Sequence, residues 1–156
     1  MPLVARLFRD YEAWLGISLC FQGFDDEVAG LPGAYAPPAG GLWLARQEAR
    51  AVGVVGLRPL DPPEVCEIKR LWVDPSAQGA GLGRRLTQTV LDAARARGYR
   101  ILRLDSLPQL ETALALYRDL GFQACPPYSD SHLPGMVFLE KDLRQSAPSE
   151  RRDAPL

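Results

Sequence analysis

The chain has 156 residues, of which 47% are hydrophobic, and 18 Lys and Arg oppose 19 Asp and Glu for a formal net charge of −1. This composition is that of an ordinary folded domain, and the length suffices to bury a core without a disulfide or a metal. The balanced charge excludes the broad basic field of a non-specific nucleic-acid binder, so any anion site has to be local.

Cysteine usage and hydropathy indicate a reducing, aqueous compartment. Cys20, Cys66 and Cys125 are odd in number and widely spaced, so they form neither a disulfide framework nor a CxxC motif. Arg6 and Arg9 interrupt the start of the chain, and no window of 18 apolar residues follows. With one histidine and no metal-ligand spacing, we expect no catalytic metal. We expect a cytoplasmic protein that binds neither nucleic acid nor membranes.

The first third of the chain predicts two helices and a hairpin. Apolar side chains three and four residues apart predict an amphipathic helix over 3–15, and a weaker pattern predicts a second helix over 24–31. The run 32–41 is too rich in Gly and Pro for either regular structure. Alternating residues then predict strands over 42–46 and 51–58, joined by a polar turn.

The third expected strand, 64–73, changes its apolar phase partway along. Cys66 and Ile68 occupy even positions, whereas Leu71 and Val73 occupy odd ones. Because a strand has period two, one extra residue between the pairs, a β-bulge, would keep all four side chains on one face. The alternative is a strand buried on both faces, which needs no strict alternation.

The second half predicts an alternation of helices and strands. Ser106 and Gln109 fit an S-x-x-Q cap at the start of the last helix. These elements make one mixed α/β (α+β) domain over 1–143, and the tail over 144–156 has too few apolar residues to fold. The elements expected here are helices over 82–97 and 108–120 and strands over 100–105, 122–125 and 136–140.

A glycine-rich turn joins the third strand to the following helix, with the sequence Gln78-Gly79-Ala80-Gly81-Leu82-Gly83-Arg84. Such a turn aims unpaired backbone N–H groups and the positive end of the helix dipole at one point, which suits a phosphate. Arg84 and Arg85 oppose the dipole by about 0.3–1 kcal/mol each, which favours a bound anion. The spacing lacks the third glycine of G-x-G-x-x-G and the G-K-[ST] of a P-loop. A merely tight turn remains the alternative.

Three segments occur together in a recognisable order: EIKRLWVDP at 67–75, Q-x-x-G-x-G at 78–83, and L-Y-x-x-x-G-F at 116–122. In this order and spacing they resemble the GNAT superfamily of acyl-CoA-dependent N-acetyltransferases, over about residues 42–143. The resemblance implies a mixed, mostly antiparallel central sheet with a splayed strand pair and flanking helices. It also implies a strand before the first helix, where this sequence has only Met1 and Pro2.

The resemblance further implies that acetyl-CoA is the co-substrate. Main-chain N–H groups of 78–84 would hold its pyrophosphate, and the main chain of Leu71 and Val73 would pair with the pantetheine arm between the splayed strands. An asparagine contact common in the family would fall near Leu110, which is apolar. The expected cofactor-binding residues are Leu71, Trp72, Val73, Gln78, Gly79, Ala80, Gly81, Leu82, Gly83 and Arg84.

Acetyl transfer to an amine needs a base, because a lysine-like amine with a pKa near 10.4 is almost wholly protonated at pH 7. The expected base is Glu67, with Glu64 as a weaker candidate; the structural alternative is an ion pair of Glu67 with Lys69 or with another cation of the sheet. By resemblance, Tyr117 lies near the thioester sulfur and protonates the departing thiolate, although its helical spacing also fits a core aromatic. The amide of Val73 is the expected donor to the thioester oxygen.

The acceptor is expected to be a primary amine of a small molecule or peptide. No histidine lies near a cysteine in the sequence, which favours direct transfer in a ternary complex. A non-catalytic acyl-CoA-binding regulatory module, with Glu67 and Tyr117 idle, is the alternative, and a homodimer is compatible with either. The side chains expected on the acceptor side are Tyr11, Trp14, Phe21, Gln22, Phe24, Tyr35 and Tyr128, with Asp25, Asp26 and Glu27 available to attract a cation.

Overall fold

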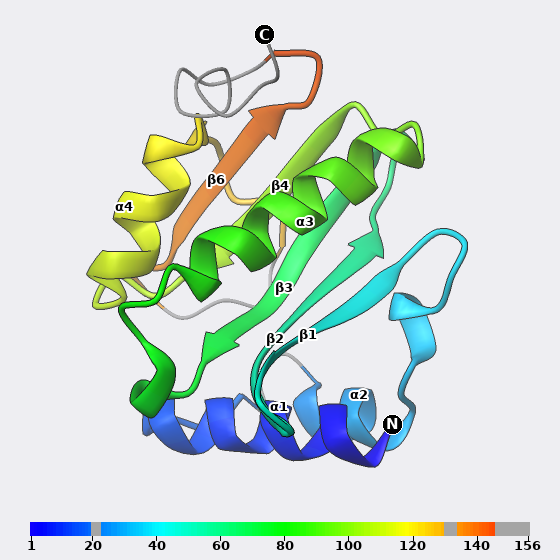
Figure 1. Cartoon of the computed structure of the whole chain (residues 1–156). Coiled ribbons are helices and arrows are strands. Elements are labelled where there is room, and N and C mark those ends of the chain that lie inside the picture. Colours follow the sequence, from blue (N-terminus) through cyan, green and yellow to red (C-terminus); the bar gives the residue numbers. More distant parts are fainter. Residues whose placement is uncertain (20–22, 130–133, 146–156) are drawn as a thin grey trace, which may run out of the picture.

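One mixed sheet of six strands, in the order β1-β2-β3-β4-β6-β5, organises the computed structural model, which describes residues 1–19, 23–129 and 134–145 (Figure 1). All neighbouring strands are antiparallel except β3 and β4. The helices are α1 (Pro2–Leu15), α2 (Phe24–Ala29), α3 (Leu82–Ala96) and α4 (Glu111–Asp119). The strands are β1 (Gly41–Gln47), β2 (Arg50–Pro59), β3 (Val65–Val73), β4 (Ile101–Ser106), β5 (Gln123–Ala124) and β6 (Val137–Asp142), with 3-10 turns η2 (Gly33–Tyr35) and η3 (Pro75–Ala77). The expected fold class is confirmed.

The sheet is covered on both faces, so its strands are buried from two sides. Val55 and Leu57 of β2 pack with α3 and α4, whereas Val54 of the same strand packs with α1 and α2. Because successive side chains of a strand point to opposite faces, these two clusters are separate cores on either side of the sheet. The α1 helix ends where expected, at Gly16, which has the left-handed φ of 74°.

The phase change in β3 is a β-bulge, as predicted. Gly56 pairs with Lys69 and Val54 pairs with Trp72, so Arg70 and Leu71 together oppose the single residue Val55. Arg70 has a φ of 61°, the left-handed conformation of one bulge residue. The alternative is also observed, since side chains of β3 are buried on both faces. The bulge therefore keeps Leu71 and Val73 on the same face as Cys66 and Ile68, while Trp72 packs on the opposite, also buried face.

The expected splay lies between β3 and β4. Their parallel pairing runs only from Val65 to Glu67 on β3, opposite Ile101 to Arg103 on β4. Beyond that point β4 stays paired with β6 along its whole length, while β3 stays paired with β2. The two central strands therefore diverge, and residues 69–73 of β3 present an edge that has no strand partner on the β4 side.

The predicted cap of the last helix is wrong. Ser106 is the final residue of β4, where it pairs with Val137, and its hydroxyl donates to the carbonyl of Leu107. The helix begins only at Glu111, and its N-cap residue, Leu110, offers no side-chain acceptor. The continuing ladder between β4 and β6 holds the backbone at 106 in extended geometry, which overrides the local capping pattern.

Several expectations fall on residues outside the described part of the chain. These are Cys20 and most of the tail expected over 144–156. None of the described helices is long and apolar enough to cross a membrane.

Candidate active site

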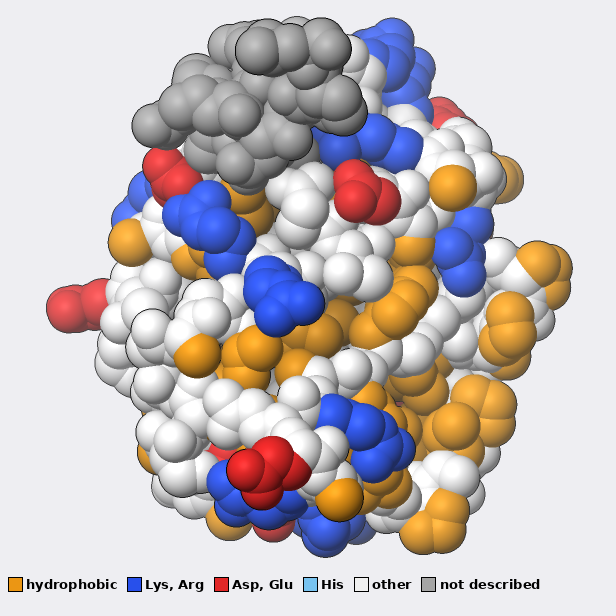
Figure 2. Space-filling view, in the orientation of Figure 1, with side chains coloured by type: hydrophobic (Ala, Val, Ile, Leu, Met, Phe, Trp, Pro, Cys, Tyr) orange, Lys and Arg blue, Asp and Glu red, His pale blue; other side chains and the backbone are white. Residues whose placement is uncertain are grey.

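A cleft of about 480 Å³, here called the main cleft, opens between the end of β3, the start of α3 and the start of α4. These segments meet at one end of the sheet (Figure 1), and apolar side chains reach the surface beside Lys and Arg side chains on this face (Figure 2). The residues predicted to bind the cofactor that line it are Leu71, Trp72, Val73, Gln78, Gly79, Gly81, Leu82, Gly83 and Arg84. Ala80 is exposed and is not among the lining residues.

The glycine-rich turn has the geometry of an anion site. Gly79 and Gly81 have φ values of 90° and 77°, a conformation that other residues rarely adopt, and Gly81 is the N-cap of α3. The first hydrogen bond of the helix runs from the N–H of Arg85 to the carbonyl of Gly81. The amides of 82–84 therefore have no helical acceptor and lie at the positive end of the dipole.

The charge at the helix start is balanced differently than expected. Arg84 donates to Asp119 of α4 across 2.5 Å, with both side chains about half exposed. An exposed pair of this kind contributes at most about 1 kcal/mol. Asp119 therefore offsets part of the unfavourable interaction between the Arg84 charge and the helix dipole. The position of Arg84 indicates a bound anion less strongly than the sequence suggested.

Trp72 adds a buried donor to the wall of the main cleft. Its side chain is buried, and its indole Nε1 has no hydrogen-bond partner among the described residues. Such a group costs about 1–3 kcal/mol unless something accepts from it. Nearby, the Gln78 side chain donates to the carbonyl of Val73 and so holds the turn against the end of β3.

A narrow slot of about 50 Å³ lies where β3 and β4 diverge, and Tyr117 of α4 lines it together with Tyr11, Leu71 and Asp105. Burial raises the pKa of Tyr117 above that of a free phenol, and Tyr11 and Asp105 raise it further. The phenol is therefore protonated at neutral pH. Its ring also packs edge-on against a core aromatic, so Tyr117 is at once a core side chain and part of the slot.

Glu67 lies in a separate space of about 250 Å³, here called the side chamber. Its side chain is only 1% exposed. Arg58 donates to one carboxylate oxygen across 2.7 Å, and the Tyr128 hydroxyl donates to the other across 2.5 Å. Lys69 is more distant, with its Nζ 3.8 Å from Oε2. The predicted pairing with a cation is thus observed, with Arg58 as the closer partner.

Two further ion pairs border the side chamber. Lys69 donates to Asp105 of β4, and Arg70 forms a two-pronged contact with Glu27 of α2 at 3.0 Å for each bond. Burial acts to raise the pKa of Glu27, but Arg70 holds it below its ordinary value. The bulge directs Arg70 to this partner, so Glu27 is occupied by the protein itself and is not open to attract an acceptor.

The seven side chains expected on the acceptor side are found in three places. Tyr11 and Trp14 line the main cleft and Tyr128 lines the side chamber. Phe24 and Tyr35 belong instead to the core beneath α1. The remaining two, Phe21 and Gln22, lie outside the described residues.

Sequence reasoning missed four residues that line these spaces, two in the side chamber and two in the main cleft. Asp105 and Arg58 complete the buried charge network, and the available signal was the presence of charged residues inside otherwise apolar strands. In the main cleft, Gln109, just before α4, and Thr112, in its first turn, supply polar groups beside the apolar Leu110.

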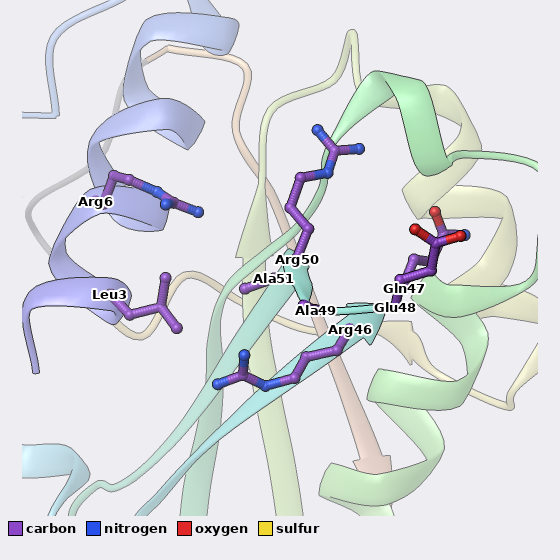
Figure 3. Close-up of a pocket in the computed structure, with 8 residues that line it drawn as sticks. All are labelled: Leu3, Arg6, Arg46, Gln47, Glu48, Ala49, Arg50 and Ala51. Atoms are coloured by element: carbon purple, nitrogen blue, oxygen red, sulfur yellow. The ribbon is translucent and has the colours of Figure 1, made fainter.

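A further hollow, of about 720 Å³, lies away from these groups, between the start of α1 and the β1–β2 turn (Figure 3). Three exposed arginines, Arg6, Arg46 and Arg50, stand around it. Arg50 donates to Ser76 of η3, so the hollow borders the loop that leads into the glycine-rich turn. None of the predicted site residues lines it.

Comparison with known proteins places this geometry in context. The family model for the acetyltransferase (GNAT) family matches residues 6–122. An uncharacterised N-acetyltransferase of Schizosaccharomyces pombe is 35% identical over 88% of this chain and 85% of its own, and one of Escherichia coli is 30% identical over 78% and 75%. A Klebsiella pneumoniae protein proposed to be an acyl-CoA N-acyltransferase is 27% identical, with a TM-score of 0.70 over 88% of each chain.

Proposed function

This chain belongs to the GNAT acetyltransferase family and is an N-acetyltransferase; on that premise, we propose that it transfers the acetyl group of acetyl-CoA directly to a primary amine of a small molecule or peptide. Acetyl-CoA is its co-substrate. The similar Klebsiella protein is named as an acyl-CoA N-acyltransferase. The observation that carries the proposal is the main cleft. It joins a glycine-rich helix start to the unpaired edge of a bulged, splayed strand.

In the proposed complex, the amides of 82–84 hold the pyrophosphate and the free edge of β3 pairs with the pantetheine arm. An extended arm that adds to a strand edge satisfies main-chain groups which the splay leaves without a partner. Trp72 lines the cleft, and its buried indole N–H, which has no partner among the described residues, is a proposed further donor to the cofactor. The thioester would then lie in the slot beside Tyr117.

Glu67 is the proposed base. Both of its oxygens already accept hydrogen bonds, so a proton from the acceptor reaches it through the Tyr128 hydroxyl, which passes its own proton to Glu67 as it receives another. Tyr117 is the proposed acid. As the carbon–nitrogen bond forms and the carbon–sulfur bond breaks, its phenol proton passes to the sulfur of CoA, and the phenolate regains a proton from the acceptor nitrogen, which loses its second proton as the amide forms. The Val73 amide is the proposed donor to the thioester oxygen.

Direct transfer fits the state of Cys66, the cysteine nearest to these groups in sequence. Its thiol is buried in the core and donates to the carbonyl of Ile101. Burial raises the pKa of Cys66 to about 12, and Glu67 adds to the effect. A thiol of this kind is a poor nucleophile because the thiolate is the reactive form.

Two measurements test the proposal. The melting temperature of the protein is compared with acetyl-CoA, ATP and NAD, and release of free CoA is followed with a panel of amines, amino acids and peptides. We expect stabilisation by acetyl-CoA of about 2.7 kcal/mol at a hundredfold excess over Kd, and amine-dependent CoA release. Equal stabilisation by ATP, or CoA release that no amine increases, would contradict the proposal.

A further inference from the structure

A buried ion pair spans the gap between the diverging strands. The Nζ of Lys69 on β3 lies 3.2 Å from each carboxylate oxygen of Asp105 on β4. The two side chains are 6% and 8% exposed. Because strand pairing ends at Glu67, this contact joins β3 to β4 at a level where no ladder hydrogen bonds do so.

The pair also stands between two cavities. Lys69, Asp105 and Arg70 line both the slot that contains Tyr117 and the side chamber that contains Glu67 and Tyr128. An acceptor that enters through the side chamber therefore meets the Lys69–Asp105 pair before it reaches the thioester position in the slot.

Of the three cations that line the side chamber, Lys69 makes the longest hydrogen bonds, two of 3.2 Å to Asp105, and its Nζ lies 3.8 Å from Glu67. Arg58 contacts Glu67 at 2.7 Å, and Arg70 grips Glu27 with two bonds at 3.0 Å. The lysine contact is longer, at 3.2 Å, and an ammonium on a flexible four-carbon stem lacks the fixed fork of a guanidinium. Its ammonium has the same charge and the same three donors as a protonated primary amine.

We propose that Asp105 binds the ammonium group of the acceptor, and that Lys69 occupies this position in the empty enzyme until a compact primary amine displaces it. The inference rests on the proposed function, because it assigns the acceptor side of the same site. Lys69 itself lines the side chamber and turns into it when it is displaced. Asp105 thus selects cationic primary amines, and a chamber of about 250 Å³ favours compact ones.

A purely structural ion pair makes a different prediction. If the pair only joins the strands, removing either partner weakens the same contact, and both variants impair acceptor use in the same direction. If Lys69 competes with the acceptor, its removal frees Asp105 and improves acceptor binding, whereas removal of Asp105 abolishes it. The opposite sign of the two effects is the signature of competition.

The first experiment measures CoA release with ethylamine, butylamine and hexylamine as acceptors. We expect Asp105→Asn to raise the acceptor KM at least tenfold and Lys69→Met to lower it severalfold, with the Kd of acetyl-CoA unchanged in both. Lys141→Met is the matched control. Lys141 is also buried in the sheet, but it lines neither the slot nor the side chamber. An increase of similar size for both site variants would overturn the proposal.

The second experiment needs no turnover. The melting temperature is measured with butylammonium chloride against sodium chloride at equal ionic strength, for the wild type, Lys69→Met and the double variant Lys69→Met/Asp105→Asn. The double variant leaves no unpaired charge at this position and so guards against simple misfolding. We expect stabilisation by butylammonium in Lys69→Met that exceeds the wild type and is lost in the double variant. Equal shifts in all three proteins would overturn the assignment.

The two experiments separate the two levels of inference. A wild type that binds acetyl-CoA but transfers acetyl to no amine would contradict the proposed function, while the butylammonium shifts would still decide whether Asp105 is an ammonium site. Normal transfer with no difference between Lys69→Met and the double variant would leave the proposed function standing and remove Asp105 from it.

Discussion

The main cleft and the side chamber are neighbouring spaces built by different means. The main cleft relies on backbone: two glycines with positive φ, the free amides of a helix start, and a strand edge left open by the splay. The side chamber relies on side chains, with charged groups from β2, β3 and β4, of which Arg58 on β2 is partly exposed, and a tyrosine from the loop after β5.

On the proposed function, this difference would separate the binding of a constant ligand, acetyl-CoA, from the binding of a variable one, the acceptor. Backbone amides bind a phosphate whatever side chains surround them, so the main cleft tolerates sequence change outside its glycines. A network of buried ion pairs is sensitive to every member, because removing one partner leaves an uncompensated charge. The following predictions test whether the two spaces act separately, from the largest expected effect to the smallest.

The largest effect is expected at Tyr117, which lines the slot where the thioester is proposed to lie. We expect Tyr117→Phe to lower kcat by about 10²–10⁴-fold, the usual contribution of a positioned acid, while the Kd of acetyl-CoA stays within about twofold. Glu67→Gln should act in the same way on kcat. Steady-state rates of CoA release and titration with acetyl-CoA check both parts.

Tyr99→Phe is the matched control for this prediction. Tyr99 donates to the carbonyl of Ala39, away from the slot, so its loss should cost about 1 kcal/mol of stability and leave kcat unchanged. Retention of kcat in Tyr117→Phe within about threefold would show that this residue serves only as a core aromatic.

A glycine exchange tests the main cleft alone. Gly81 and Gly98 flank α3, have φ values of 77° and 83°, and would each place a new Cβ in open space. Alanine at either position should cost about 1–2 kcal/mol of stability through backbone strain. Only Gly81→Ala should also weaken acetyl-CoA binding, by about tenfold, because it distorts the amides of the helix start. A similar Kd for both variants would contradict the role of the turn.

Alkaline pH should act on the buried phenols. Burial raises the pKa of Tyr117 above its ordinary value near 10 and that of Tyr11 to about 12. The stabilisation that comes from keeping a phenol neutral is complete below about pH 10, where the unfolded chain is also protonated, and is lost as the pH rises through the folded-state value. Stability should therefore fall above pH 10.

Urea unfolding at pH 9 and pH 11 measures this effect. Because a shift of one pKa unit corresponds to about 1.4 kcal/mol, the difference in unfolding free energy between the wild type and Tyr117→Phe should change by about 1.4 kcal/mol between these pH values. An unchanged difference would mean that Tyr117 is accessible to solvent.

The smallest effect is expected at Trp72. Trp72→Phe removes a buried N–H that has no partner among the described residues, so the free protein should lose little stability. If acetyl-CoA accepts from this group, its Kd should rise about three- to tenfold in the same variant. A Kd equal to that of the wild type would place the donor outside the cofactor contacts.

The elements themselves were predictable where the signal is local. The bulge in β3 followed from the phase of four apolar residues, and the turn into α3 followed from the alternating glycines 79, 81 and 83 at a helix start. The cap at Ser106 failed, because the ladder between β4 and β6 extends through that residue. Local capping chemistry is worth about 1 kcal/mol and yields to a continuing strand.

The sequence by itself determined the glycine-rich turn, the order of the strands and helices along the chain, and the family to which the chain belongs, since these depend on neighbouring residues and on periodicity. Only the tertiary structure decided that Arg58 and Tyr128 hold Glu67, and that Lys69 and Asp105 bridge the splay from positions 36 residues apart. Charge pairing acts over a few ångströms of space and has no sequence period, so the fold alone selects its partners.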